Sequence, residues 1–368
     1  MTDVEVVHGR GSVRRLPELV GAPARPILVV GSRTGVERSG VRPLLAAREV
    51  AFFTDVSPNP RLPDVLRGCA VAEAVRPGLI LGVGGGSAMD VAKMVRGLPV
   101  DPSAAMDVLS GRTAPLHRAP LVLVPTTAGT GSEVTGFATV YVDGVKHSLD
   151  HPTVHAELSI VDPSLTESCP AAVTWAGALD AMAHAVESTW AVHSTASSRA
   201  LASAALADLV PLLGAPLSTV DRSALCRAAT NAGLAIDVTR TTAGHAFAYP
   251  LTARFGVRHG VACALNLVWL LPFTAERLRY DCQDPRGEGF VRRRLDDIEA
   301  LLGGGGEAVA ELLVRAGFSP WLVDHGVAEE DLRGLVSAAL GSGRSTNGPV
   351  RLDAHAALRA LRARLKES

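Results

Sequence analysis

Strand-like and helix-like patterns alternate through the first half of this 368-residue chain, and this alternation limits the fold more than any other feature. Short apolar runs rich in β-branched residues, each typical of a buried strand, occur at 26–30, 49–53, 79–83 and 121–125. Helical patterns at 62–75 and 87–97 separate some of these runs. Strands that alternate with helices form parallel sheets with crossover connections. The sequence therefore predicts an α/β domain with a parallel sheet.

Two further strand signals complete this first region. Asp143 and Gly144 lie between two strand-like runs within 137–149, a pattern that predicts a β-hairpin. The segment 158–163 is typical of a last strand, which Pro163 ends.

From Pro170 onward the pattern is helical. Helices are expected at 170–191, 195–213, 222–238, 259–274, 288–302, 305–316, 327–340 and 353–366. We therefore expect two domains: an α/β domain over residues 1–165 and an all-helical domain over residues 166–368.

Composition excludes several kinds of partner. The formal net charge is −1 and only 20% of residues are charged, which argues against nucleic acid and polyanionic partners. The sequence contains no CxxC pair, so we expect a reducing compartment and no disulfide framework. The N-terminus has no apolar signal core, and no long uncharged apolar run is apparent, so we expect a cytoplasmic protein without a membrane span.

A glycine-rich turn follows the strand pattern at 79–83. Gly84, Gly85 and Gly86 lead into a helical pattern, the context that a phosphate-binding turn requires, although the spacing is not GxGxxG. A second loop, 125–135, also follows a strand and is rich in hydroxyls. Its candidate side chains for a nicotinamide ribose or amide are Thr126, Thr127, Thr130 and Ser132. Each segment taken alone is also compatible with an ordinary connector.

A set of metal-ligand residues lies in the helical region. Asp180 and His184 are four residues apart in a helical pattern, so both lie on one face of the helix. His245 and His259 follow in apolar surroundings, each next to a glycine. Three imidazoles and one carboxylate suit divalent iron or zinc.

These motifs together resemble the iron-containing (group III) alcohol dehydrogenases. The resemblance rests on "GGGSAMDVAK" at 84–93, "PTTAGTGSEVT" at 125–135, "GALDAMAHAVES" at 177–188 and the two histidines before "GVACAL". It implies a dinucleotide-binding α/β domain, an all-helical metal-binding domain and a homodimer. It also implies metal ligation by Asp180, His184, His245 and His259.

The resemblance further assigns cofactor and catalytic residues. Gly84, Gly85, Gly86, Ser87 and Asp90 belong to the implied pyrophosphate motif, and Thr126, Thr127, Thr130 and Ser132 to the nicotinamide side. The implied reaction is hydride transfer from NADH or NADPH to an aldehyde whose oxygen the metal polarises, with His245 and His259 as catalytic ligands. Tyr249 stands where the family often has another histidine. Tyr249 either relays a proton or packs against the site.

The turn after the first strand bears on the choice of dinucleotide. An acidic residue there would bind the ribose hydroxyls of NADH and repel the 2′-phosphate of NADPH. This chain instead has Ser32 and Arg33. We therefore expect NADPH to be favoured.

Cations near the predicted metal ligands suggest an anionic substrate. Arg240 and Arg254 flank His245, while Lys146 and Arg351 come from two other segments, 143–152 and the turn-rich loop at 343–352. A desolvated phosphonate or carboxylate requires charge-assisted donors of this kind. The segments "TRTTAGHAFAYPLT", "KHSLDHP" and "NGPVRL" resemble the phosphonoacetaldehyde reductase subgroup, which implies reduction of phosphonoacetaldehyde to 2-hydroxyethylphosphonate in phosphonate natural-product (antibiotic) biosynthesis.

Three alternatives stay open at this point. The same architecture serves general alcohol and polyol dehydrogenases and dehydroquinate synthase-like lyases, which return the nicotinamide oxidised. A non-catalytic dinucleotide-binding module is the third, although four retained ligand residues argue against it.

Overall fold

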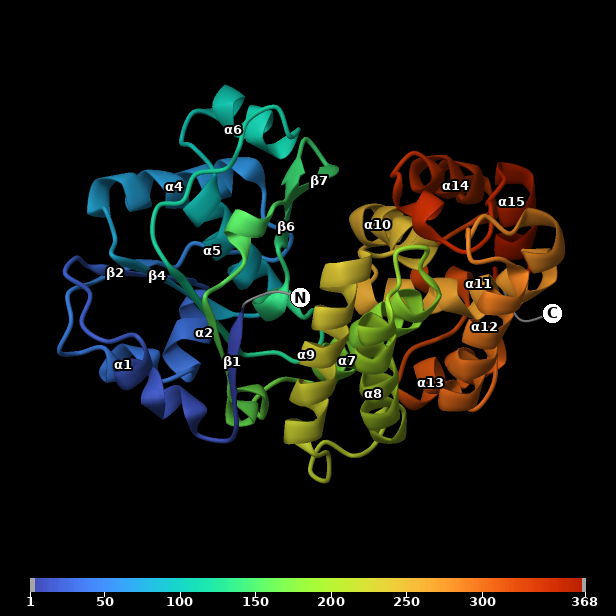
Figure 1. Ribbon diagram of the computed structural model, residues 1–368, viewed down its shortest axis with the longest axis horizontal. Helices are drawn as coiled ribbons and strands as arrows, with labels where there is room; N and C mark the ends of the chain where they lie inside the picture. Colours follow the sequence, from blue (N-terminus) through green and yellow to red (C-terminus); the bar gives the residue numbers. More distant parts are fainter. Residues whose placement is uncertain (1–3, 366–368) are drawn as a thin grey trace. The chain divides into compact units, whose positions relative to one another are not determined.

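The computed structural model describes residues 4–365, which form two compact units (Figure 1). The first unit extends to Cys169 and the second begins at Pro170. The division lies four residues after the boundary expected at residue 165.

The first unit is an α/β domain, as predicted. A six-stranded parallel sheet has the order β1-β8-β5-β4-β2-β3. Its strands are β1 (Glu5–His8), β2 (Ile27–Gly31), β3 (Val50–Phe53), β4 (Leu79–Gly84), β5 (Leu121–Pro125) and β8 (Leu158–Val161). The predicted hairpin forms from β6 (Phe137–Val142) and β7 (Val145–Asp150), with Asp143 and Gly144 at positive φ.

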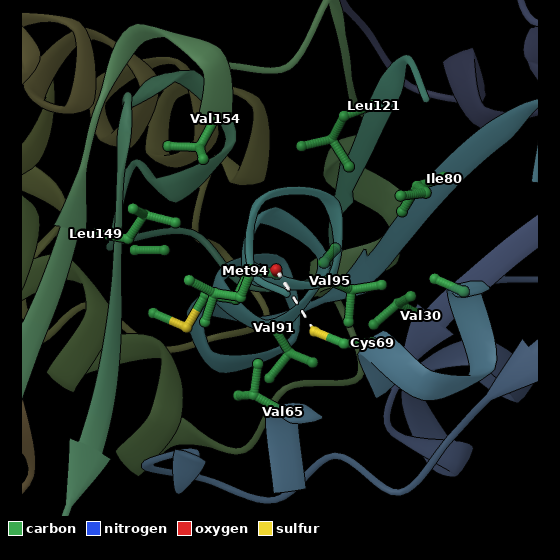
Figure 2. Close-up of a cluster of buried hydrophobic side chains, with 14 of the residues drawn as sticks. Val30, Val65, Cys69, Ile80, Val91, Met94, Val95, Leu121, Leu149 and Val154 are labelled. Carbon is green, nitrogen blue, oxygen red and sulfur yellow. Dashed lines mark hydrogen bonds between the residues drawn. The ribbon is translucent and has the colours of Figure 1, made fainter. Parts of the chain in front are cut away.

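Helices cover both faces of this sheet. On one face lie α4 (Leu62–Val75), α5 (Gly86–Gly97) and α6 (Pro102–Leu109); on the other lie α1 (Leu16–Leu19), α2 (Arg33–Arg38) and α3 (Val41–Leu44). Successive strand residues point to opposite faces, so Leu28 and Val30 join the first core while Ile27 and Val29 join the second. Figure 2 shows the first core, in which valines and Met94 of α5 pack against strand residues.

The second unit is all-helical, also as predicted. Its helices are α7 (Ala171–Trp190), α8 (Ala196–Leu212), α9 (Arg222–Thr239), α10 (Ala243–Phe255), α11 (His259–Asp281), α12 (Glu288–Leu302), α13 (Gly306–Arg315), α14 (Leu332–Leu340) and α15 (Ala354–Arg362). Among the described residues, α11 alone is long and apolar enough to cross a membrane. However, 78% of its most apolar window is buried in the fold, as in the core helix of a globular protein.

Several elements went unpredicted. Strand β1 is a short, half-exposed edge strand, and α1–α3 have four to six residues each, too short to show periodicity. Helix α10 is the important omission. Its first six residues are all buried and Pro250 lies inside it, so it shows no alternation of polar and apolar faces.

Candidate functional site

The glycine turn of the first unit lies where ligands bind in open parallel sheets. From β2 the chain adds β3 on one side, then returns to add β4 on the other side of β2. The sheet therefore has a topological switch point between β2 and β4, and ligands bind beyond the carboxyl ends of strands at such points. Gly31 pairs with Val83 in this register, so the turns after β2 and β4 are neighbours.

The glycine turn and the hydroxyl-rich loop pack directly against each other. A Cβ on Gly85 would lie 3.2 Å from Thr127 Oγ1, and one on Gly86 would lie 2.8 Å from Thr130 Cγ2. Gly84 has a φ of 146° and no side chain caps α5. The first backbone N–H groups of α5 can therefore bind an anion, and side chains larger than glycine would disturb the loop.

A hydrogen bond between Asp90 of α5 and Ser132 connects the glycine turn and its helix to the hydroxyl-rich loop. Asp90 Oδ1 accepts a hydrogen bond of 2.7 Å from Ser132 Oγ, and Oδ2 accepts one of 3.0 Å from the Thr139 N–H. The fully buried Lys93 Nζ donates to Ser132 Oγ and to Thr135 Oγ1, each at 3.1 Å. Burial raises the pKa of Asp90, although Lys93 opposes this. This network holds the loop against α5.

Ser32 and Arg33 lie at the carboxyl end of β2. Ser32 is the N-cap of α2, and its Oγ accepts a hydrogen bond from the Gly35 N–H. Arg33 is the first residue of the helix and is exposed. Both residues therefore border the switch point, where the adenosine end of a dinucleotide binds in such folds.

The predicted metal ligands converge in the second unit. Helix α7 carries Asp180 and His184, α10 carries His245, and α11 begins at His259. Asp180 Oδ1 lies 3.8 Å from Nε2 of His184, 3.6 Å from Nε2 of His245 and 3.9 Å from Nε2 of His259. The rings of His184 and His245 stack at a centroid distance of 4.7 Å. Ligand atoms about 2.0–2.1 Å from a tetrahedral metal would be about 3.4 Å apart. The distances from Asp180 Oδ1 to the three Nε2 atoms would therefore shorten by only a few tenths of an ångström around a bound ion.

The polar atoms of this cluster indicate that a cation belongs there. Asp180 is 4% and His245 2% exposed, and among the described residues neither Asp180 Oδ1 nor His245 Nε2 has a hydrogen-bond partner. A buried polar atom without a partner is costly. Burial alone would raise the pKa of Asp180, but His184, His259 and His245 lower it well below its ordinary value. The residues therefore fit a divalent metal ion.

Glu187 orients one of these histidines. It is fully buried, one turn beyond His184 on α7, and accepts a hydrogen bond from His245 Nδ1. It also accepts bonds from Thr242 Oγ1 at 2.6 Å and the His245 N–H at 3.3 Å. Because Nδ1 donates to this carboxylate, the neutral ring of His245 has its proton on Nδ1 and a lone pair on Nε2, which faces Asp180. Burial disfavours the charged form of His245, but Cys263 and Glu187 raise its pKa well above 6.5, so an ion that binds Nε2 displaces a proton from it.

Tyr249 and Cys263 also border the cluster. The Tyr249 ring stacks on the His259 ring at a centroid distance of 5.9 Å and an interplanar angle of 5°. Cys263 Sγ lies 3.8 Å from His259 Nε2, and burial raises the pKa of this thiol to about 11.

The four predicted substrate cations have different surroundings. Arg240 ends α9, and its guanidinium bonds the Asp237 carbonyl and lies 3.6 Å from the Asp237 carboxylate. Arg254 pairs with Asp331 at the surface, Arg351 is exposed, and Lys146 lies in β7 of the first unit. Their contact with a substrate stays a prediction.

The backbone at Arg240 is unusual. Its φ of 60° and ψ of 169° belong to a region that only glycine adopts without strain. Asn347 Nδ2 donates to the carbonyl oxygens of Thr239, Arg240 and Thr241 at 2.8, 3.4 and 3.1 Å, and so holds this turn. A strained residue beside a ligand-bearing helix suggests a functional constraint.

Sequence reasoning missed Glu187 and Cys263 at this site. Both had a signal: Glu187 is seven residues after Asp180 on the same helix face, and Cys263 is four after His259, the spacing that singled out Asp180 and His184.

Comparisons with known proteins agree over nearly the whole chain. The model of the family described as "Iron-containing alcohol dehydrogenase" matches residues 4–163, and that of "Fe-containing alcohol dehydrogenase family, C-terminal" matches 174–364. A phosphonoacetaldehyde reductase of Streptomyces viridochromogenes is 34% identical, over 95% of this chain and 93% of its own. The long-chain-alcohol dehydrogenase 1 of Geobacillus thermodenitrificans is 34% identical over 83% of this chain and 77% of its own. A sulfoacetaldehyde reductase from Bifidobacterium kashiwanohense, solved with NAD+, superposes with a TM-score of 0.85 at 26% identity, over 100% of this chain and 98% of its own.

Proposed function

The chain belongs to the iron-containing alcohol dehydrogenase family, and from this premise we propose that it reduces a small anionic aldehyde, phosphonoacetaldehyde in first place, to the primary alcohol. As a family member it is a metal-dependent NAD(P)-linked oxidoreductase. The proposal concerns its substrate, its preferred dinucleotide and the residues that bind them.

The observation that carries the substrate proposal is a chemical feature common to two relatives. One is named for phosphonoacetaldehyde and the other for sulfoacetaldehyde. Both compounds are two-carbon aldehydes with a tetrahedral anionic head. A site for such a head needs a cation with several directed donors, and a guanidinium has five.

Arg240 is the residue we assign to that head. It stands five residues before His245, in a turn with a strained backbone whose carbonyl oxygens accept hydrogen bonds from Asn347. Strain of this kind costs about 1–3 kcal/mol and persists where function requires it. One or more of Lys146, Arg254 and Arg351 would supplement it.

The metal centre would hold Fe²⁺ or Zn²⁺ through Asp180, His184, His245 and His259. Bound there, the ion supplies electron withdrawal from the carbonyl oxygen of the aldehyde. Glu187 keeps His245 in the tautomer that presents Nε2 to the ion. Tyr249, stacked on His259, is the candidate donor of the proton that the product alcohol requires.

The first unit would bind the dinucleotide. The N–H groups that begin α5 hold the pyrophosphate, and the loop with Thr126, Thr127 and Thr130 lies against the nicotinamide side. At the end of β2, Ser32 and Arg33 favour NADPH because no carboxylate repels a 2′-phosphate there. Ser32→Asp should shift the ratio of kcat/KM values toward NADH, and a strong NADH preference of the unaltered protein would contradict the assignment.

A substrate panel tests the main proposal. Metal-reconstituted protein is assayed with phosphonoacetaldehyde, acetaldehyde, butanal, lactaldehyde and succinic semialdehyde. We expect the highest kcat/KM for phosphonoacetaldehyde. Equal rates with butanal would favour a general alcohol dehydrogenase, and turnover without net consumption of NAD(P)H would favour a lyase.

Arginine variants test the site. Arg240→Ala should raise KM for phosphonoacetaldehyde and leave that for acetaldehyde unchanged. Arg227→Ala is a matched control, since Arg227 lies on the same helix α9 and pairs with Asp208 at the surface. An unchanged KM in Arg240→Ala would remove Arg240 from the site.

A further inference from the structure

Cys263 lies among the metal-ligand residues, although the family resemblance assigns it no role. It is buried on α11, one turn after His259. Its sulfur and single ligand atoms of Asp180, His245 and His259 all lie within 4.8 Å of one another. We propose that the Cys263 thiolate is itself a ligand of the divalent ion, and that it makes this centre prefer Zn²⁺ over Fe²⁺. The proposal depends on the metal centre inferred above, and not on the substrate.

The distances suit a shared ion. The thiolate would be a fifth protein ligand beside Asp180, His184, His245 and His259, and zinc sites can expand to five ligands. With a metal–sulfur bond of about 2.3 Å and a metal–nitrogen bond of about 2.0–2.1 Å, the angles of about 90–120° in a five-ligand site give sulfur–nitrogen distances of about 3.1–3.8 Å. Cys263 Sγ lies 3.8 Å from His259 Nε2. The observed distance is therefore compatible with an ion that both Cys263 and His259 bind.

A second observation points to a ligand at the same place. Within the described part of the chain, Asp180 Oδ1 and His245 Nε2 are both buried and have no hydrogen-bond partner. Both atoms belong to the group that contains the Cys263 sulfur. An ion there would satisfy the carboxylate and the imidazole, and the sulfur lies within reach of the same ion.

The surroundings of Cys263 differ from those of an ordinary core cysteine. Cys69 is also fully buried, but its thiol lies among valines and faces the Met94 carbonyl oxygen at 3.8 Å (Figure 2). Such a cysteine acts as a small apolar residue. Cys263 instead lies against the imidazoles of His245 and His259.

The chemical consequence concerns the choice of metal. When the ion binds, the S–H bond of Cys263 breaks, its proton passes to solvent and a sulfur–metal bond forms. The thiolate and the Asp180 carboxylate then balance the two positive charges of the ion. Thiolate is a soft ligand, and a soft sulfur ligand favours Zn²⁺ over harder divalent ions.

Cobalt substitution tests the ligand directly, without an activity measurement. The full-length protein is stripped of metal and reloaded with Co²⁺, and its near-ultraviolet absorption is recorded. We expect a thiolate-to-cobalt charge-transfer band that is lost in Cys263→Ser and Cys263→Ala and retained in Cys226→Ala, a buried cysteine on α9. Absence of the band in the unaltered protein, or its persistence in Cys263→Ala, would overturn the proposal.

Metal competition tests the preference. The stripped protein is equilibrated with Zn²⁺ and Fe²⁺ under anaerobic conditions, and bound metal is measured. Cys263→Ser should lower the affinity for Zn²⁺ by at least about 10-fold, since removal of a mere outer partner of a ligand already costs about 10–100-fold, with a smaller effect on Fe²⁺. Equal loss for both ions would contradict the assigned preference. Circular dichroism of each variant separates loss of a ligand from loss of folding, and aldehyde reduction by the unaltered protein separately tests the proposed function.

Discussion

Replacement of Glu187 by glutamine tests whether the metal centre depends on the tautomer of His245. Glutamine has nearly the shape of glutamate, and its carbonyl oxygen can keep the hydrogen bonds from Thr242 Oγ1 and the His245 N–H. Its NH2 group then faces Nδ1 of His245. Because an NH2 group donates, His245 must accept at Nδ1 and carry its proton on Nε2, the atom 3.6 Å from Asp180 Oδ1. A protonated Nε2 cannot bind a metal.

The size of the effect follows from the bond that is lost. A hydrogen bond to a charged group contributes about 1.5–3 kcal/mol, and about 1.4 kcal/mol corresponds to a tenfold change in affinity. We therefore expect Glu187→Gln to weaken metal binding by about 10–100-fold, the range seen for such outer partners of metal ligands. Competition for Zn²⁺ with a chromophoric chelator measures this.

The control separates metal binding from folding. Asp284→Asn also neutralises a buried carboxylate of the second unit, one that pairs with Arg286. We expect this variant to lose stability and to bind metal normally. Metal affinity unchanged in Glu187→Gln, or reduced equally in both variants, would refute the reasoning.

Three further predictions follow from strain, close packing and charge. Arg240→Gly and Arg240→Ala should raise KM for the anionic aldehyde to the same extent. The free energy of unfolding should be about 1 kcal/mol or more higher for the glycine variant than for the alanine variant, because only glycine adopts a φ of 60° here without strain. Equal denaturant midpoints of the two variants would contradict this. Gly86→Ala should weaken NAD(P)H binding by about tenfold or more, because the added methyl group overpacks Thr130, and it should leave the metal content unchanged. Fluorescence titration measures the affinity, and adding Thr130→Ser to this variant should restore part of it. Full affinity in Gly86→Ala would show that the contact is not tight. Burial would raise the pKa of Asp162, but hydrogen bonds from the Ser164 hydroxyl and from the Gly11, Val13 and Ser164 N–H groups lower it below its ordinary value. Asp162→Asn should therefore cost about 2–3 kcal/mol in urea unfolding above the ordinary carboxyl pKa of 3.8, and the difference should close as the pH falls through the lower folded pKa; a pH-independent difference would exclude the charge as its cause.

Local patterns in the sequence predicted the elements whose signal lies within one segment. The strands at 79–83 and 121–125 appear within one residue of their expected bounds, and the helices at 62–75 and 288–302 appear at them. Each of these segments has its own apolar periodicity or run, so neighbouring residues suffice to define it. The helical spacing of Asp180 and His184 likewise placed both on one face of α7, as the structure has them.

Features that depend on contacts between distant segments were decided by the tertiary structure. The strand order, which places the switch point between β2 and β4, is a property of pairing and not of any single strand. Helix α10 is buried among its neighbours, so packing and not amphipathic pattern forms it.

The proposed metal centre combines both kinds of information. In the sequence, residue types and spacing predicted Asp180, His184, His245 and His259 as metal ligands. Only the packing of α7, α10 and α11 placed the Glu187 carboxylate on His245 and brought the Cys263 sulfur within 4.8 Å of ligand atoms of Asp180 and His245. The physical reason is that periodicity reports which way a side chain points from its own helix, whereas the partner that it meets is set by how helices pack across long sequence separations.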